Sequence, residues 1–145
     1  MKKKLLIVFV VLLVLGGAAG VYVWKYVYNK PHPDYITMPA DFVVAADALF
    51  GEFVAGSADA EKRYNGKVVE ISGMVSALET ADSLVVAVFV FRQGDFGDEG
   101  IRCAMDARAA ESVQQLNPGQ QVRIKGYLTG YNGTDVILEK CSVVN

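Results

Sequence analysis

The sequence predicts a mainly β protein, a barrel of five strands in the order β-β-β-α-β-β, preceded by an amphipathic helix and an N-terminal transmembrane helix. Three observations lead to this fold class. A long uncharged apolar run stands near the N-terminus, five short apolar or alternating segments follow residue 67, and an alanine-rich helical segment separates the third from the fourth. A small five-stranded barrel with this order is typical of the oligonucleotide/oligosaccharide-binding (OB) fold.

The N-terminal apolar run is long enough to cross a lipid bilayer as a helix. It begins at Leu5 and ends at Trp24 without a charged residue, which corresponds to about 30 Å of helix. Three lysines precede it, and aromatic residues gather at its far end, where they favour the membrane interface. We therefore expect residues 1–28 to form a single-pass signal-anchor in a bacterial cytoplasmic (inner) membrane, with the N-terminus inside and the barrel extracytoplasmic.

A cleaved signal peptide is the alternative interpretation of the same run. Residues 5–15 have the length of a signal-peptide core, and residues 16–20 are small enough for a cleavage site. The apolar character continues through Trp24, however, and a mature N-terminus would leave that stretch exposed, so we favour the anchor. No cysteine follows the run closely, which argues against a lipid-modified N-terminus. Both interpretations place the remaining residues outside the cytoplasm.

The part beyond the membrane segment is acidic and is long enough for one domain. Residues 31–145 carry nine Lys and Arg against sixteen Asp and Glu, a net charge of −7, although the whole chain is near neutral at −2. We interpret residues 29–39 as a linker, because Pro31 and Pro33 favour an extended spacer. The only histidine, His32, lies in this linker, where no acid/base partner is evident.

Residues 40–66 are predicted to form an amphipathic helical segment that starts close to Pro39. Gly56 and Ser57 should interrupt the helix, or bend it. We expect its apolar side to pack on the protein's own barrel rather than in the groove of a partner. The apolar positions at helical spacing are Phe42, Ala46, Leu49, Phe50 and Phe53.

Residues 67–145 are assigned to the OB barrel. Gly73 suggests a bulge or sharp bend in the first strand, and Asn132-Gly133 is a strong hairpin signal before the last. The glycine-rich and acidic residues 92–100 read as a mobile loop, and residues 107–116 as a short helix. An open five-stranded sandwich is the main alternative. The predicted strands cover residues 67–79, 84–91, 101–106, 121–129 and 136–144.

Three stretches of the chain resemble the tRNA_anti-like family of bacterial OB-fold proteins. They are YNGKVVEISGMV at residues 64–75, LNPGQQVRIKG at residues 116–126 and DVILEKC at residues 135–141. The helix that ends at Tyr64 also fits the family, so the resemblance covers roughly residues 40–145. It implies an OB fold and a membrane anchor. Members are mostly uncharacterised, and the family supplies no catalytic residues to carry over.

Cys103 and Cys141 are the only cysteines, an even number in a domain that is expected to be exported. The third and fifth strands of an OB barrel are neighbours, so a disulfide between the two residues is geometrically feasible. We favour this disulfide over two buried thiols, which remain the alternative. Two cysteines without CxxC spacing or a nearby histidine are too few for a metal site, and no cofactor is predicted.

The expected ligand-binding face consists of the second and third strands with the adjoining connections, including residues 80–82. Its aromatic rings and arginines suit stacking on bases or sugars. The net charge of −7 nevertheless disfavours nucleic acid, which requires a positive groove. The candidate ligand-binding residues are Phe89, Phe91, Arg92, Arg102 and Tyr131.

We expect a non-enzymatic binding module that is attached to the membrane through its apolar run. The partner would be an envelope protein or a carbohydrate-like ligand, and a single-stranded nucleic-acid-binding domain is the alternative. No serine stands in a GxSxG motif, and no histidine is available in the barrel to activate one. The acids Asp95, Asp98 and Glu99 lack the spacing of a calcium loop and are interpreted as solvated.

Overall fold

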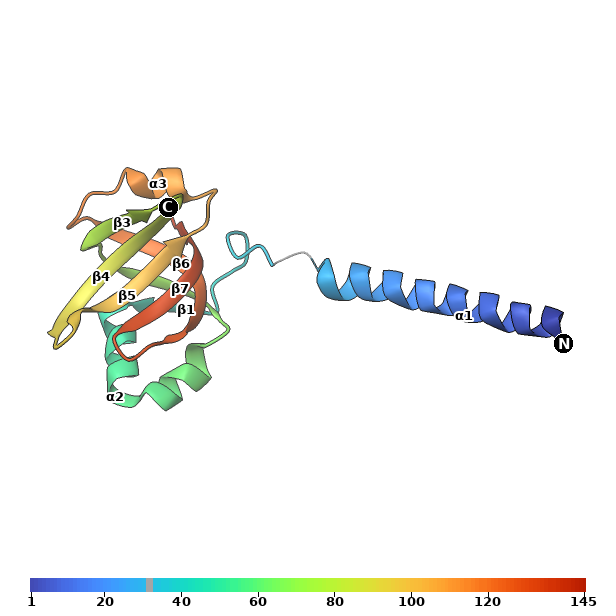
Figure 1. Cartoon of the computed structure of the whole chain (residues 1–145). Coiled ribbons are helices and arrows are strands. Elements are labelled where there is room, and N and C mark those ends of the chain that lie inside the picture. Colours follow the sequence, from blue (N-terminus) through green and yellow to red (C-terminus); the bar gives the residue numbers. More distant parts are fainter. Residues whose placement is uncertain (31–32) are drawn as a thin grey trace. The chain divides into compact units, whose positions relative to one another are not determined.

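A computed structural model describes residues 1–30 and 33–145 (Figure 1). The chain divides into two compact units, Met1–Pro33 and Asp34–Asn145. Pro31 and His32, on which the predicted linker and its histidine depend, lie outside the described residues. Residues 34–39, which the sequence assigned to the linker, belong to the second unit.

The first unit is one continuous apolar helix. Helix α1, Lys2–Val23, passes directly into the π-helical turn η1, Trp24–Tyr28. None of its side chains is buried by the protein, and no side of it is polar. By length and composition, the helix from Lys2 to Tyr28 can cross a membrane.

The second unit is a mainly β barrel, which confirms the predicted fold class. Its sheet has seven strands where five were predicted, because β1 is additional and the first predicted strand, residues 67–79, is divided between β2 and β3. The strand order is β1-β2-β6-β7-β5-β4-β3, with β5 and β7 parallel as the OB fold requires. β2 lies near one end of this order and β3 at the other, yet only Val75 and Ser76 separate them in the chain. The two ends of the sheet therefore meet, and the sheet closes into a barrel. The strands are β1 Phe42–Ala45, β2 Val68–Met74, β3 Ala77–Ala81, β4 Leu84–Gly94, β5 Gly97–Met105, β6 Gln121–Tyr131 and β7 Asp135–Val143.

The closure occurs where the first predicted strand changes its neighbour. The amide of Val75 donates to Gln120 O at 3.0 Å, beside β6, whereas the amide of Ser76 donates to Val88 O in β4 at 2.8 Å. The sequence placed the irregularity at Gly73, two residues earlier. Gly73 instead makes room for the start of the helix that precedes this strand, because a Cβ there would lie 3.0 Å from the Cβ of Ala46.

The segment before this helix corrects the prediction for residues 40–66. Phe42–Ala45 forms strand β1, parallel to β2, and is not part of the helix. The β-branched Val43 and Val44 favour the extended conformation, and pairing covers an edge of β2 that would otherwise be open. Helix α2, Ala46–Tyr64, follows, and Gly56 interrupts it with φ −163° and ψ 75°, as the sequence indicated.

Helices α2 and α3 close opposite ends of the barrel (Figure 1). The apolar side of α2 packs on the barrel, which confirms the expected self-packing, and its residues Leu49, Phe53 and Tyr64 are almost completely buried. Helix α3, Ala110–Gln114, contributes the fully buried Val113 at the other end, and is shorter than the predicted residues 107–116.

Residues 92–100 form a regular hairpin and not the predicted loop. Strands β4 and β5 continue to the pair Gly94 and Gly97, and only Asp95 and Phe96 form the turn. The glycines and acids of this stretch favour a loop when each residue is considered alone. The pairing is stabilised by contacts across the two strands, above all by the ion pair of Arg92 with Glu99.

Candidate functional site: the outer face of the barrel

Phe89 lies inside the barrel and not on its surface. Its side chain has no exposed area, and its register partner in β5, Ile101, is equally buried. A Cβ on Gly100 would overlap the carbonyl oxygen of Phe89, so the two strands are closely packed here. This ring can stabilise the fold, but it offers no surface to a ligand.

Helix α2 covers the other two aromatic candidates. Phe91 stacks on Phe50 with 5.6 Å between ring centroids, and Tyr131 packs on Phe53 at the same distance. Phe91 keeps 37% of its area exposed, whereas the hydroxyl of Tyr131 donates to Gly133 O at 2.8 Å. Both rings therefore have intramolecular partners where stacking on a base or sugar would require a free face.

The two candidate arginines are paired with carboxylates. Arg102 donates from Nε to Asp135 at 3.0 Å and from a terminal nitrogen to Glu79 at 2.7 Å. Partial burial acts to lower the pKa of Arg102, but the two acids outweigh it and raise the pKa above its ordinary value. Arg92 pairs with Glu99 in the same manner. A phosphate would have to displace these acids before it could bind either arginine.

Between these residues the outer side of the sheet carries a strip of aliphatic side chains. Ala87 and Phe89 point into the core, so the alternating positions of β4 point outward. Arg102 shares this outer side, since it pairs in register with Val88 and Ile137. Of the outward positions, Leu84 is 46% exposed, Val88 is only 5% exposed and the others are half-buried. We call the following set the outer strip: Ala77, Leu84, Val86, Val90, Ala104 and Ile137.

A shallow groove of about 500 Å³ adjoins the outer strip at Val90. It lies where β2 bends into β3, and its walls include Met74, which is 62% exposed, and Phe91. The hydroxyl of Ser76 accepts a hydrogen bond from the amide of Val90 at 2.9 Å and thereby bridges the gap between the strands. The apolar surface of the barrel thus continues from the strip into this groove.

The two cysteines are neighbours in the core, as expected from their strands. Both are completely buried free thiols. Burial raises the pKa of the Cys141 thiol well above its ordinary value, and the contact with Cys103 adds to this. The structure contains no bond between the two sulfurs, so the disulfide stays a prediction.

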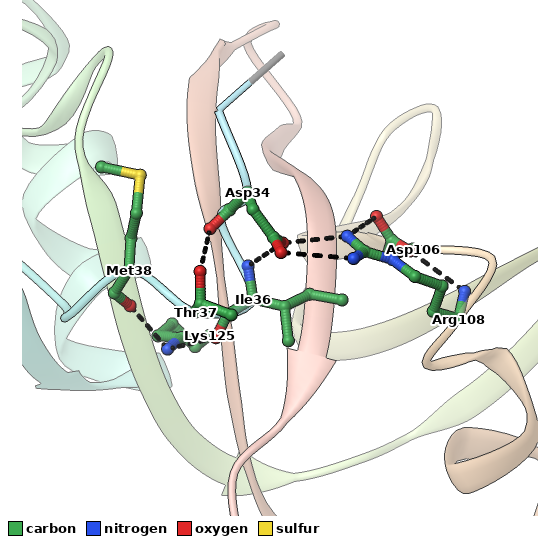
Figure 2. Close-up of polar contacts among 7 residues, drawn as sticks. All are labelled: Asp34, Ile36, Thr37, Met38, Asp106, Arg108 and Lys125. Carbon is green, nitrogen blue, oxygen red and sulfur yellow. Dashed lines mark hydrogen bonds and ion pairs between the residues drawn. The ribbon is translucent and has the colours of Figure 1, made fainter. Parts of the chain in front are cut away.

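A segment that the sequence analysis missed lies across the outer side of β6. Residues 34–41, here called the strap, are attached through backbone and side chain (Figure 2). Lys125 Nζ donates to Ile36 O at 2.9 Å and to Met38 O at 2.7 Å. Tyr35 stacks on Tyr127 with 4.7 Å between ring centroids. The strap thus joins the barrel directly after Pro33.

Arg108 attaches the start of the strap to the connection between β5 and α3 by binding two aspartates. Arg108 donates to Asp34 at 2.9 Å and to Asp106 at 3.0 Å (Figure 2). Asp34 also accepts from the amide of Ile36 at 3.3 Å, which forms a local turn. This turn and the contact of Arg108 with Asp106 are local, whereas the contact of Arg108 with Asp34 joins residues 74 positions apart and has no sequence signal.

Acid is expected to weaken this attachment. Hydrogen bonds from Arg108 hold the pKa of Asp34 and the pKa of Asp106 below their ordinary value. A carboxyl with a lower pKa in the folded state stabilises the fold above the ordinary value of about 3.9, and the contribution disappears as the pH falls through the folded-state pKa. NMR titration of the wild type should show the pKa of Asp34 and the pKa of Asp106 below the ordinary value. In Arg108→Gln both pKa values should return towards about 3.9. Ordinary values in the wild type would contradict the pairing.

The described residues contain no group of three His, Cys, Asp or Glu side chains that could hold a metal ion. A groove of about 900 Å³ lies beside α3 and is lined mainly by polar residues such as Gln115, Gln121 and Arg123. Arg123 already contacts Glu70 and the carbonyl oxygen of Asn145 there. The outer strip is an apolar surface without an evident structural role.

Fold and strand order together define an OB-fold domain with an apolar helix at its N-terminus. The sequence profile of the tRNA_anti-like family matches residues 1–143, nearly the whole chain. The chain belongs to the tRNA_anti-like family, as its resemblance to that family implied.

Solved structures share the barrel at low sequence identity. A "putative nucleic acid-binding lipoprotein" from Klebsiella pneumoniae is 17% identical with a TM-score of 0.55, and the alignment covers 80% of this chain and all of that one. Asparaginyl-tRNA synthetase from Entamoeba histolytica is 18% identical with a TM-score of 0.44 over 74% of this chain, which spans about a quarter (24%) of the synthetase. No curated protein matches the chain. At these identities the likeness concerns the fold alone.

Proposed function

We propose that this chain is a membrane-anchored, extracytoplasmic and non-enzymatic binding module whose partner is a protein of the cell envelope. The observation that carries the proposal is the outer strip. Its aliphatic side chains lie on the strands that OB folds use for ligands, and they offer neither aromatic faces nor unpaired cations. Flat apolar surface rimmed by charged residues is typical of protein–protein contacts.

Retention in the membrane is supported by the length of the first unit. The helix extends past Trp24 to Tyr28, beyond the point where a signal peptide with small residues at 16–20 would be cut. A retained helix would keep the second unit attached to the membrane, which favours an envelope protein as its partner.

Nucleic acid is the alternative, and the charges of the second unit argue against it. Phosphate contacts supply most of the nonspecific affinity of nucleic-acid-binding proteins, and they depend on available Lys and Arg. Arg92 and Arg102 are already neutralised by Glu99, Asp135 and Glu79. The Klebsiella protein is named for nucleic acid, but its 17% identity supports only a common fold.

The proposal predicts two results with the full-length chain. Gel shifts of the detergent-solubilised protein with single-stranded DNA and RNA at low salt should show no binding at micromolar concentration. A photo-crosslinking amino acid in place of Val86 should give one discrete protein adduct in native membranes, whereas the same group in place of the exposed Asn132 should give none. Salt-sensitive micromolar binding to either nucleic acid, without an adduct from position 86, would overturn the proposal.

A further inference from the structure

The turn of the β4–β5 hairpin exposes an aromatic ring that no part of the fold requires. Phe96 is 96% exposed, more than any other large apolar side chain of the second unit. Figure 1 shows β4 and β5 running together to this turn at the edge of the domain. Asp95 and Phe96 are here called the hairpin tip.

Turn chemistry does not explain the phenylalanine. Two-residue hairpin turns are rich in Asn, Asp and Gly, which adopt positive φ readily and are well solvated. Here neither Asp95 nor Phe96 has a positive φ, and Gly97 supplies it, +127°, so this turn tolerates a phenylalanine but does not select one. The exposed ring of Phe96 gains none of the stabilisation that burial of a phenylalanine side chain provides. Neither turn formation nor core packing selects this residue.

The stem below the hairpin tip is ordered before any partner binds. Gln93 donates to Asp98 at 3.3 Å across the strands, and Arg92 pairs with Glu99 one step further down. The Glu99 carboxylate lies against Gly94, and a Cβ there would displace it. Binding through a pre-ordered hairpin avoids most of the entropy cost of fixing a loop.

The charges around the ring indicate the chemistry of its partner. Asp95 and Asp98 flank Phe96, and neither forms an ion pair among the residues that the structure describes. Two carboxylates beside an aromatic ring are repelled by the anionic lipids of a bilayer surface. They complement an apolar pocket with lysines or arginines at its rim, which steers association and selects against other partners.

We infer that Phe96 is the anchor residue with which this domain docks into an apolar, basic-rimmed pocket of an envelope protein. This inference rests on the proposed function and names the chemistry of its partner. Aromatic side chains buried at the centre of an interface carry much of the binding free energy, often 2 kcal/mol or more, which corresponds to a loss of about thirtyfold in affinity when they are removed.

The decisive experiment uses the full-length chain in native membranes with the photo-crosslinking group at position 86 or position 96. Position 96 should give a discrete adduct that disappears when Asp95→Lys and Asp98→Lys are combined. The adduct should persist with Asp59→Lys, a charge reversal on the exposed side of α2. Phe96→Ser should reduce the adduct from position 86 about tenfold or more, with an unchanged circular dichroism spectrum, since the ring contributes nothing to the core.

Each other outcome rejects a defined part of the inference. An adduct from position 86 that is insensitive to Phe96→Ser leaves the outer strip as the binding surface and removes Phe96 as its anchor. Lipid adducts from position 96 would assign the ring to the bilayer, and adducts of twice the chain mass would assign it to a second copy. Absence of adducts from both positions would reject the proposed function together with the inference.

Discussion

Phe89→Ala is expected to lower the free energy of unfolding by about 3–5 kcal/mol, whereas Phe91→Ala should lower it by only about 1–2 kcal/mol. Phe89 is completely buried, so its removal leaves a cavity in the core of the barrel. Phe91 keeps 37% of its area exposed and loses mainly its stacking on Phe50. Urea unfolding of the full-length chain in detergent, followed by the β-sheet signal in circular dichroism, measures both changes.

The comparison separates a core residue from a partly exposed residue two positions further along the same strand. Equal and small losses from both substitutions would show that Phe89 does not occupy the core. The slope of the unfolding transition should stay the same in both variants, since a changed slope indicates a changed denatured state and would invalidate the comparison.

Gly100→Ala should destabilise the domain by about 2–3 kcal/mol, while Gly51→Ala should stabilise it by about 0.5–1 kcal/mol. A Cβ at Gly100 would overlap the carbonyl oxygen of Phe89, and a backbone atom inside a strand ladder cannot move aside without separating β4 from β5. Gly51 is helical, exposed and free of neighbours within 4 Å, so alanine only improves helix propensity there. Thermal unfolding of the two variants should shift in opposite directions.

The opposite signs make this pair a test of strand register. A neutral Gly100→Ala would mean that the pairing of Gly100 with Val90 is wrong. A destabilising Gly51→Ala would mean that α2 is packed on the side that the structure leaves exposed. Neither result depends on the identity of the binding partner.

Local signals predicted most of the barrel. Alternating or continuous apolar segments indicated strands, and the turn at Asn132-Gly133 and the interruption at Gly56 both occur where the sequence predicted them. These features depend on backbone preferences of a few adjacent residues, so they can be recognised without tertiary information. The same holds for the apolar helix at the N-terminus.

Features that depend on distant residues were missed or misplaced. β1 was interpreted as helix because Phe42 fits a helical spacing, and the open edge of β2, which decides for the extended form, lies more than twenty residues further along the chain. The hairpin at residues 92–100 depends on pairs across two strands. The strap depends on Lys125, which is 87–89 residues away from the carbonyl groups that it contacts.

The ligand-binding candidates illustrate the same limit on one strand. Both faces of β4 are apolar along residues 84–91, so no alternation indicated which of its side chains point inward. Phe89 enters the core, and Phe91, at the register shift between Val90 and Arg92, meets α2. Likewise, the acids that neutralise Arg102 come from β3 and β7, and the sequence could not pair them with it.

The amino-acid sequence by itself determined that an apolar helix precedes a small OB barrel, because hydrophobic periodicity, helix breakers and turn residues act over short distances. Tertiary structure alone decided which side chains reach the surface, which charges neutralise one another and that residues 34–41 attach to β6. The physical reason is that burial and ion pairing depend on neighbours in space, and here those neighbours are separated by up to 89 residues of chain.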